Sequence, residues 1–123
     1  MTVHRQVVEQ SNLTISVIGL GYVGLPTAVA FHSSGFTVKG VDINHEIVER
    51  LISGESHLID STEKLELPKI SERWDVTSDI SEVVEETDIF LITVPTPVDG
   101  SKNPDLRFVK TAINSIHCGF NKS

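Results

Sequence analysis

Residues 16–26, SVIGLGYVGLP, bring three glycines together between a short apolar run and a pattern typical of a helix. Glycine is common, so the spacing G-x-G-x-x-G constrains a fold only weakly by itself. Here, however, the apolar residues of 13–18 indicate a strand buried on both faces, and residues 23–33 have helical spacing with Pro26 in the first turn. The order strand, glycine turn and helix predicts an α/β fold with a parallel sheet.

Each glycine of this motif has a separate role if the turn binds a dinucleotide. Gly19 makes the tight turn after the strand, Gly21 allows a pyrophosphate to approach the backbone, and Gly24 allows the helix to pack closely on the strand. The helix then directs its first N–H groups and the positive end of its dipole toward the phosphates. The alternative is that the three glycines merely build a turn.

An acidic residue stands where a dinucleotide site requires one. Residues 36–41 alternate and are rich in β-branched side chains, which predicts a second strand, and Asp42 ends that strand. It lies roughly 20 residues after the glycine motif, where its carboxylate can accept hydrogen bonds from the hydroxyls of the adenosine ribose. The carboxylate would repel a 2′-phosphate, so the expected cofactor is NAD rather than NADP. Without a dinucleotide, Asp42 would only help to cap the next helix.

The rest of the chain continues the alternation of helices and strands. Asn44 can cap the next helix, which Gly54 closes, and residues 55–73 are expected to form a loop with one short acidic helix at 62–66. The capped helix has an apolar stripe of Ile47, Val48, Leu51 and Ile52. An edge strand at 74–79, a short helix at 81–86, a strand at 89–94 and a turn-rich loop are expected to follow. Asp105 then caps a helix at 106–116 with Leu106, Val109, Ile113 and Ile116 on its apolar side, and residues 117–123 show no periodicity.

Four strands are found in this pattern, whereas a complete dinucleotide-binding sheet has about six. The sequence therefore predicts a Rossmann-type, doubly wound parallel sheet that is truncated before the full six strands. We expect a tail at 1–12, a partial NAD-binding domain at 13–117 and a second tail at 118–123. An unpaired strand at the edge of such a sheet favours association, so formation of a homo-oligomer is left open.

Composition excludes several classes of protein. A net charge of -7 argues against nucleic acid as a partner, because its phosphates demand a basic surface. No apolar run approaches the length of a membrane span or of a signal peptide. The single cysteine, Cys118, excludes an internal disulfide and is typical of a reducing cytoplasm. We predict no metal site, since His4, His32, His45 and His117 form no recognisable ligand set.

Further motifs lie on both sides of the last predicted strand. The letters VPTP at 94–97 follow that strand at the edge where open α/β sheets bind ligands, although they also suit a rigid turn. The stretch IGLGYVGLPTA, together with VPTP and NPDL, closely resembles the nucleotide-sugar dehydrogenases of the UDP-glucose and GDP-mannose dehydrogenase family, over about residues 13–116. Within it, SGESHLID and VPTPVDGSKNPDL are most similar to the branch that oxidises UDP-N-acetylmannosamine, followed by other UDP-N-acetylhexosamine dehydrogenases. Ile47 stands where many UDP-glucose enzymes have a basic residue.

The resemblance implies a two-step oxidation of the sugar C6 alcohol to a carboxylate, for polysaccharide precursor synthesis. Two NAD would be used in succession, with a covalent thiohemiacetal at a catalytic cysteine. The family's catalytic residues and UDP-sugar pocket lie beyond the point where this chain stops, so we assign no catalytic residue, expect UDP-sugar binding only in a full-length protein, and do not take Cys118 as the nucleophile. Carried over by position, the cofactor-binding residues are Gly19, Gly21, Tyr22, Val23 and Gly24 at the pyrophosphate, Asp42 at the adenosine ribose, and Val94, Pro95 and Thr96 along the cofactor.

Three alternatives remain at this point. The chain could be an NAD-binding module without chemistry, a UDP-glucose dehydrogenase, or another Rossmann oxidoreductase such as a β-hydroxyacid or 6-phosphogluconate dehydrogenase. The last group is not expected to carry GYVGLPTA and VPTP together. Tyr22 could also be a plain packing aromatic.

Overall fold

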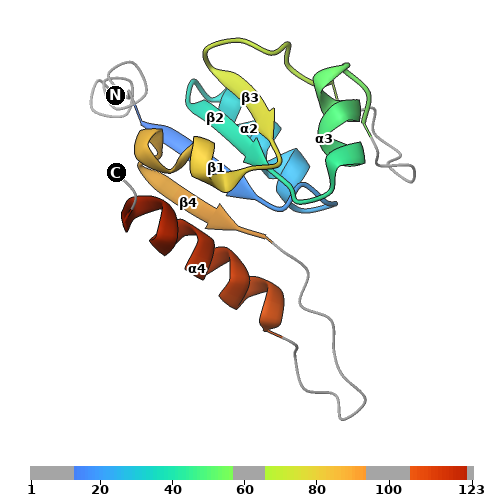
Figure 1. The fold of residues 1–123 in the computed structure, drawn as a ribbon. Coiled ribbons are helices and arrows are strands. Elements are labelled where there is room, and N and C mark those ends of the chain that lie inside the picture. The colour runs from blue at the N-terminus through green and yellow to red at the C-terminus, as the bar shows by residue number, and fades with distance from the viewer. Residues whose placement is uncertain (1–12, 57–65, 94–105, 122–123) are drawn as a thin grey trace.

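The computed structural model describes residues 13–56, 66–93 and 106–121. These residues form one sheet in the order β3-β2-β1-β4, in which all three pairs of neighbouring strands are parallel (Figure 1). This order matches the first four positions of the doubly wound order 3-2-1-4-5-6. It confirms the predicted fold class. The strands are β1 at Thr14–Ile18, β2 at Thr37–Val41, β3 at Trp74–Thr77 and β4 at Ile89–Ile92.

The central strand β1 is buried on both faces, as the apolar run predicted. Ile15 and Val17 point into one core, whereas Ile18 belongs to a second core on the opposite face. Ser16 also points to the second side, where its hydroxyl shares a hydrogen bond of 2.6 Å with the Thr87 hydroxyl. This hydrogen bond allows the polar Ser16 side chain to be fully buried in an interior strand.

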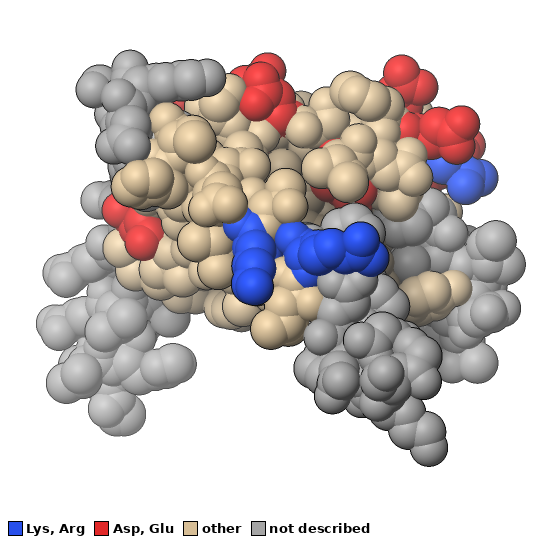
Figure 2. Space-filling model, turned by 60° about the horizontal axis from the view of Figure 1, so that its bottom comes forward, with Lys and Arg blue, Asp and Glu red and all other residues tan. Residues whose placement is uncertain are grey.

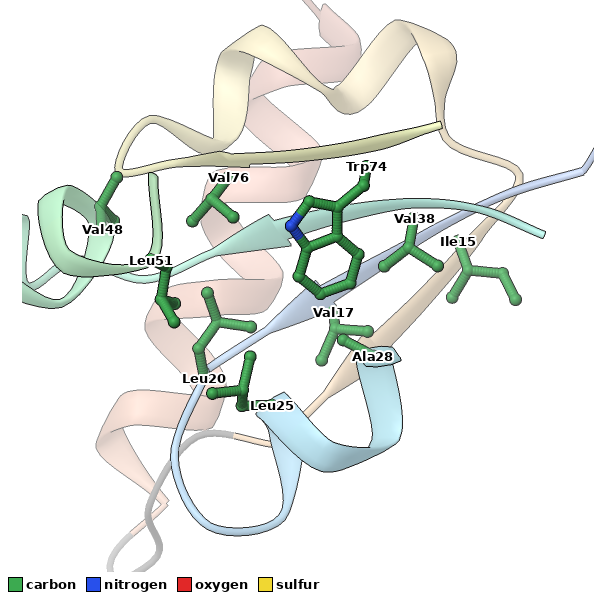
Figure 3. Close-up of a cluster of buried hydrophobic side chains, with 10 residues drawn as sticks. All are labelled: Ile15, Val17, Leu20, Leu25, Ala28, Val38, Val48, Leu51, Trp74 and Val76. Atoms are coloured by element: carbon green, nitrogen blue, oxygen red, sulfur yellow. The ribbon is translucent and has the colours of Figure 1, made fainter. Parts of the chain in front are cut away.

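The first core lies between the sheet and two helices, α2 at Gly24–Ser33 and α3 at His45–Ile52. Figure 3 shows Trp74 of β3 among aliphatic side chains from β1, β2 and both helices. Leu20, which follows β1 directly, reaches into the same core and is only 1% exposed. The Leu20 side chain therefore anchors the glycine turn in the hydrophobic core. The buried members of the cluster are Ile15, Val17, Leu20, Leu25, Ala28, Val38, Val48, Leu51, Trp74 and Val76.

The second core covers the opposite face of the sheet. Two 3-10 turns, η1 at Ile80–Glu82 and η2 at Val84–Glu86, connect β3 to β4, and α4 at Arg107–Asn121 packs against both. The buried members of this second core are Ile18, Val41, Val83 and Ala112. Layers on both faces make the sheet doubly wound. Because all strands are parallel, the carboxyl ends of the four strands lie at one edge of the sheet.

Local signals set the ends of α2 and α3. After α2, Gly35 adopts a φ of 103° and donates its N–H to His32, while the N–H of Phe36 reaches the carbonyl of Phe31. This pair of hydrogen bonds is a Schellman motif, in which glycine avoids the steric cost of a left-handed backbone. Asn44 caps α3 as predicted, since its side chain accepts hydrogen bonds from Glu46 at 3.0 Å and Ile47 at 3.4 Å.

The structure differs from the sequence predictions in the second half of the chain. The helix expected at 81–86 is a pair of 3-10 turns that meet at Val83. The last helix continues to Asn121, so residues 118–121 are helical rather than an irregular tail. Its predicted apolar stripe is also shifted, because Ala112 is buried while Ile113 is 51% exposed. The main contacts of α4 are with the short turns η1 and η2, which cover a narrower strip than a full helix would.

One residue of the stripe predicted on α3 also lies outside the core. Val48 and Leu51 are buried and Ile47 packs against them, but Ile52 is 52% exposed. Residues 62–65 of the helix expected at 62–66, and the cap Asp105, fall outside the described residues.

Charged side chains are unevenly spread over the surface. On the face drawn in Figure 2, acidic side chains gather in separate groups toward the edges, and basic side chains lie near the middle among uncharged residues and also beside the acidic group at the right edge. Within the described ranges, no helix is both long and apolar enough to cross a membrane.

Candidate functional site

A cavity of about 810 Å³ opens at the carboxyl edge of the sheet. Open α/β sheets bind ligands at this edge, and the volume is within the usual range for small-molecule sites. Its walls come from the glycine turn, the ends of β1, β2 and β3, the residue after β4, and one side of α4. The lining residues are Ile18, Gly19, Leu20, Gly21, Tyr22, Val23, Val41, Asp42, Ile43, Asn44, Ile47, Ser78, Asp79, Ile80, Thr93, Thr111, Ala112 and Ser115.

The glycine turn is fixed to the sheet at its first residue. The N–H of Gly19 donates a hydrogen bond of 2.8 Å to the carbonyl of Val41, which ends β2. Gly19 has a φ of 99°, a backbone conformation that residues other than glycine rarely adopt. Behind the turn, Leu20 packs over Gly40, where an added Cβ would lie 3.0 Å from the Leu20 Cδ1 atom.

The second and third glycines differ in what surrounds them. A Cβ on Gly24 would lie 1.8 Å from the carbonyl oxygen of Gly19, so only glycine allows α2 to start this close to the turn. A Cβ on Gly21, in contrast, would have no atom of the described chain within 4 Å. The protein's own packing therefore leaves the space above Gly21 open, and this space faces the cavity. Such an opening fits a ligand that approaches the backbone, as a pyrophosphate does.

Several N–H groups at the start of α2 are available to such a ligand. Within the described part of the chain, the N–H groups of Gly21, Tyr22, Val23 and Gly24 have no recorded hydrogen-bond partner. The cap residue Val23 supplies no side-chain acceptor, and the first turn of α2 contains no acidic residue. Free N–H groups and the positive end of the helix dipole together favour an anion here.

Asp42 lies at the opposite side of the turn, directly after β2. Its Oδ2 atom accepts a hydrogen bond of 2.9 Å from the N–H of Leu20, and its Oδ1 atom accepts one of 2.9 Å from the N–H of Asn44. The carboxylate is thus held by the backbone on two sides, yet each oxygen keeps a further lone pair. It lines the cavity and can accept hydrogen bonds from ligand hydroxyls.

Sequence reasoning did not single out Leu20 and Thr93, which both shape this site. The Thr93 hydroxyl donates a hydrogen bond of 2.7 Å to the carbonyl of Gly19, and the Thr93 N–H donates one of 2.7 Å to the carbonyl of Ile18. A threonine at the end of an apolar strand was visible in the sequence. Its contact with the glycine turn was not, because it depends on β4 lying beside β1.

The remaining predicted residues are placed as follows. Tyr22 and Val23 line the mouth of the cavity and are 62% and 67% exposed, so Tyr22 is no core aromatic. Val94, Pro95 and Thr96 lie outside the described residues. Cys118 is exposed on α4. Among the residues that the structure describes, no three His, Cys, Asp or Glu side chains form a group that could hold a metal ion.

Comparison with known proteins agrees with this geometry. Residues 13–123 match the model of the UDP-glucose/GDP-mannose dehydrogenase family, NAD binding domain. The chain is 43% identical over 103 residues to the UDP-N-acetyl-D-mannosamine dehydrogenase of Escherichia coli K12, covering 84% of this chain and 24% of that enzyme. It is 37% identical over 110 residues to the enzyme of the same name from Pyrococcus horikoshii, covering 85% of this chain and 25% of that enzyme.

Solved structures give the same result. A UDP-glucose dehydrogenase from the hyperthermophilic archaeon Pyrobaculum islandicum superposes with a TM-score of 0.76 and 33% sequence identity, over 89% of this chain and 26% of that one. The chain thus spans about a quarter of the length of the relatives it matches. The family match sets aside the β-hydroxyacid and 6-phosphogluconate dehydrogenases as alternatives. The chain belongs to the UDP-glucose/GDP-mannose dehydrogenase family, and it corresponds to that family's NAD-binding domain.

Proposed function

We propose that this chain binds NAD at the carboxyl edge of its sheet, as the cofactor-binding part of a dehydrogenase that oxidises UDP-N-acetylmannosamine to the uronate. One observation carries the assignment of the site. The backbone at Gly21 is open toward the cavity and continues into the unpaired N–H groups at the start of α2, with Asp42 facing the same cavity. These features match two parts of a dinucleotide, the anionic pyrophosphate and a ribose with two hydroxyls.

The residues have separate roles in this proposal. The N–H groups of Gly21, Tyr22, Val23 and Gly24 hold the pyrophosphate, while Gly19 shapes the turn that presents them. Asp42 accepts hydrogen bonds from the adenosine ribose, and its negative charge disfavours the 2′-phosphate of NADP. Val94, Pro95 and Thr96 border the cofactor. Bound NAD supplies the hydride acceptor for the oxidation, and the groups named here bind and orient it.

Similarity to the Escherichia coli and Pyrococcus horikoshii enzymes supports UDP-N-acetylmannosamine as the substrate of the whole protein. The second candidate is UDP-glucose, which the Pyrobaculum islandicum structure favours through its TM-score of 0.76. Ile47 supports the first candidate, because many UDP-glucose enzymes have a basic residue at that position.

The 123-residue chain by itself is proposed to bind NAD without turning over a nucleotide sugar. The cofactor-binding unit in this proposal begins at residue 13, after a tail at 1–12, and includes α4 through Asn121. A cytoplasmic location is part of the same proposal, supported by the single cysteine.

Isothermal titration calorimetry of the purified chain with NAD tests the site. We expect saturable binding that weakens by at least about tenfold in Asp42→Ala, because a hydrogen bond to a charged group contributes about 1.5–3 kcal/mol. NADP serves as a second ligand and should bind more weakly than NAD. A chain that is folded by circular dichroism but gives no heat with NAD would contradict the proposal.

A second assay tests whether the chain alone is inactive. Absorbance at the NADH band is followed after UDP-N-acetylmannosamine or UDP-glucose is added to the chain with NAD. We expect no NADH with either sugar. NADH formation with one of them would overturn the assignment as a cofactor-binding part alone, and it would also identify the substrate.

A further inference from the structure

The peptide unit between Gly19 and Leu20 is held at both of its polar ends. Its carbonyl oxygen, on Gly19, accepts the hydrogen bond of 2.7 Å from the Thr93 hydroxyl. Its N–H, on Leu20, donates the hydrogen bond of 2.9 Å to the carboxylate of Asp42. One planar group is thus fixed between the residue after β4 and the residue after β2, with the glycine turn in the middle.

This peptide unit needs such restraint because of the glycine that precedes it. Gly19 lacks a Cβ and populates positive and negative φ almost equally, so sterics alone do not fix the orientation of the plane. If the plane turned over, the Leu20 N–H would point away from Asp42 and the Gly19 carbonyl would lose its donor. Unless the φ of Leu20 rotated by the opposite amount, the N–H groups that follow in the turn would change direction as well.

Thr93 is itself held rigidly enough to serve as the fixed point. Its N–H donates a hydrogen bond of 2.7 Å to the Ile18 carbonyl, which continues the pairing of β4 with β1. A β-branched side chain has restricted χ1 freedom, so the hydroxyl keeps its direction. The same oxygen lies 2.4 Å from the place where a Cβ on Gly24 would be, which shows how closely Thr93 approaches the start of α2.

We propose that Thr93 is a positioning residue for cofactor binding, whose hydroxyl sets the orientation of the Gly19–Leu20 peptide and thereby the direction of the N–H groups that receive the pyrophosphate. This inference rests on the proposed NAD site. Thr93, which lies outside the glycine motif, would then contribute to the affinity for NAD together with the motif itself.

The test compares two variants of the 123-residue chain, Thr93→Val and Thr93→Ser. Valine keeps the shape of threonine and removes the hydroxyl, whereas serine keeps the hydroxyl. We expect the dissociation constant for NAD to rise about three- to tenfold in Thr93→Val, the effect of losing one neutral hydrogen bond, and to stay within about twofold in Thr93→Ser. Thr37→Val, at the amino end of β2 and away from the cavity, is the matched control and should bind NAD like the unchanged chain.

Amide hydrogen exchange supplies a readout that a general loss of stability does not mimic. The Leu20 amide should exchange slowly in the unchanged chain and in Thr93→Ser, and faster in Thr93→Val, while the Val38 and Val41 amides of β2 keep their protection. Fast exchange of the Leu20 amide in the unchanged chain would overturn the inference even if Thr93→Val fails to fold.

The outcomes separate this inference from the function on which it rests. If the unchanged chain does not bind NAD, the proposed function fails. If it binds NAD and Thr93→Val binds equally well with Leu20 still protected, NAD binding stands and the role of Thr93 is refuted. Equal weakening in Thr93→Val and Thr93→Ser would also refute it, because the hydroxyl would then not be the group responsible.

Discussion

The N–H group of Leu20 and the carboxylate of Asp42 are joined by a hydrogen bond of 2.9 Å, which connects the glycine turn to the end of β2. The two parts of a dinucleotide fingerprint, the glycines and the acidic residue after the next strand, are therefore in direct contact before any ligand arrives. The second oxygen of Asp42 is held by the Asn44 N–H at 2.9 Å. The carboxylate is therefore held in one orientation, which in the proposed site would lower the entropy lost when a ribose binds.

A first prediction separates the structural glycine from the one that faces the ligand. Gly24→Ala would place a Cβ 1.8 Å from the Gly19 carbonyl oxygen and 2.4 Å from the Thr93 hydroxyl, so α2 or the turn must move. We expect its free energy of unfolding to fall by about 1–3 kcal/mol, the range for overpacking. Chemical denaturation followed by circular dichroism measures this change.

Gly21→Ala is the matched variant, because its Cβ meets no atom of the described chain within 4 Å. Its stability should stay within about 0.5 kcal/mol of the unchanged chain, whereas its affinity for NAD should fall, since the methyl group occupies the open space that faces the cavity. Equal destabilisation by both substitutions would refute the distinction drawn between the two glycines.

A second prediction concerns the choice between NAD and NADP. Asp42→Asn removes the negative charge and turns an amide NH₂ toward one of the two backbone N–H donors at Leu20 and Asn44. We expect NAD to bind more weakly, by about tenfold, and NADP to lose less, so that the ratio of their dissociation constants moves toward one. Calorimetric titration with both cofactors measures that ratio.

The control for net charge is Asp75→Asn, an exposed residue of β3. It should leave both dissociation constants unchanged. If Asp75→Asn shifted the ratio as much as Asp42→Asn does, the discrimination would come from the overall charge of the chain rather than from Asp42.

A third prediction concerns the cap of α3. The Asn44 side chain accepts hydrogen bonds from the N–H groups of Glu46 and Ile47, which would otherwise lack a partner in the first turn. Asn44→Ala should lower the free energy of unfolding by about 1 kcal/mol, and Asn44→Ser, which restores a capping oxygen, by clearly less. Urea denaturation with an unchanged slope measures the difference. Equal stability of the alanine and serine variants would contradict the capping role.

Local signals explain why much of this site could be predicted from the sequence. Gly19, Gly24 and Asp42 carry their meaning in their distance from adjacent strands and helices, which is set by short-range geometry. Asn44 acts within one helical turn of its own position. Each of these residues would be recognised without any knowledge of which strands are neighbours.

The parts that were missed depend on contacts between distant segments. Thr93 reaches Gly19 only because β4 pairs with β1, an order that the sequence pattern does not contain. The burial of Ala112 instead of Ile113 depends on the narrow strip that η1 and η2 offer to α4. Helical periodicity predicts that one face of a helix is apolar, but its partner decides which residues of that face are covered.

The last prediction concerns the pH dependence of stability through His32. Burial lowers the pKa of His32 from its ordinary value of 6.5, and the positive charge of Arg73 lowers it further. The imidazole also contacts the edge of the buried Trp74 ring, at a centroid distance of 5.6 Å. The folded chain therefore binds this proton less readily than the unfolded chain does. His32 opposes folding only at a pH where its imidazole is protonated in the unfolded chain, so stability should decrease as the pH falls from about 7 through 6.5 and below.

Replacing His32 by Gln should flatten the slope of unfolding free energy against pH between pH 7 and pH 5.5 and leave it unchanged above pH 7.5. Trp74 is the single tryptophan of the chain, so its fluorescence follows unfolding in both proteins. Identical slopes for the two proteins below pH 7 would show that His32 does not carry this dependence.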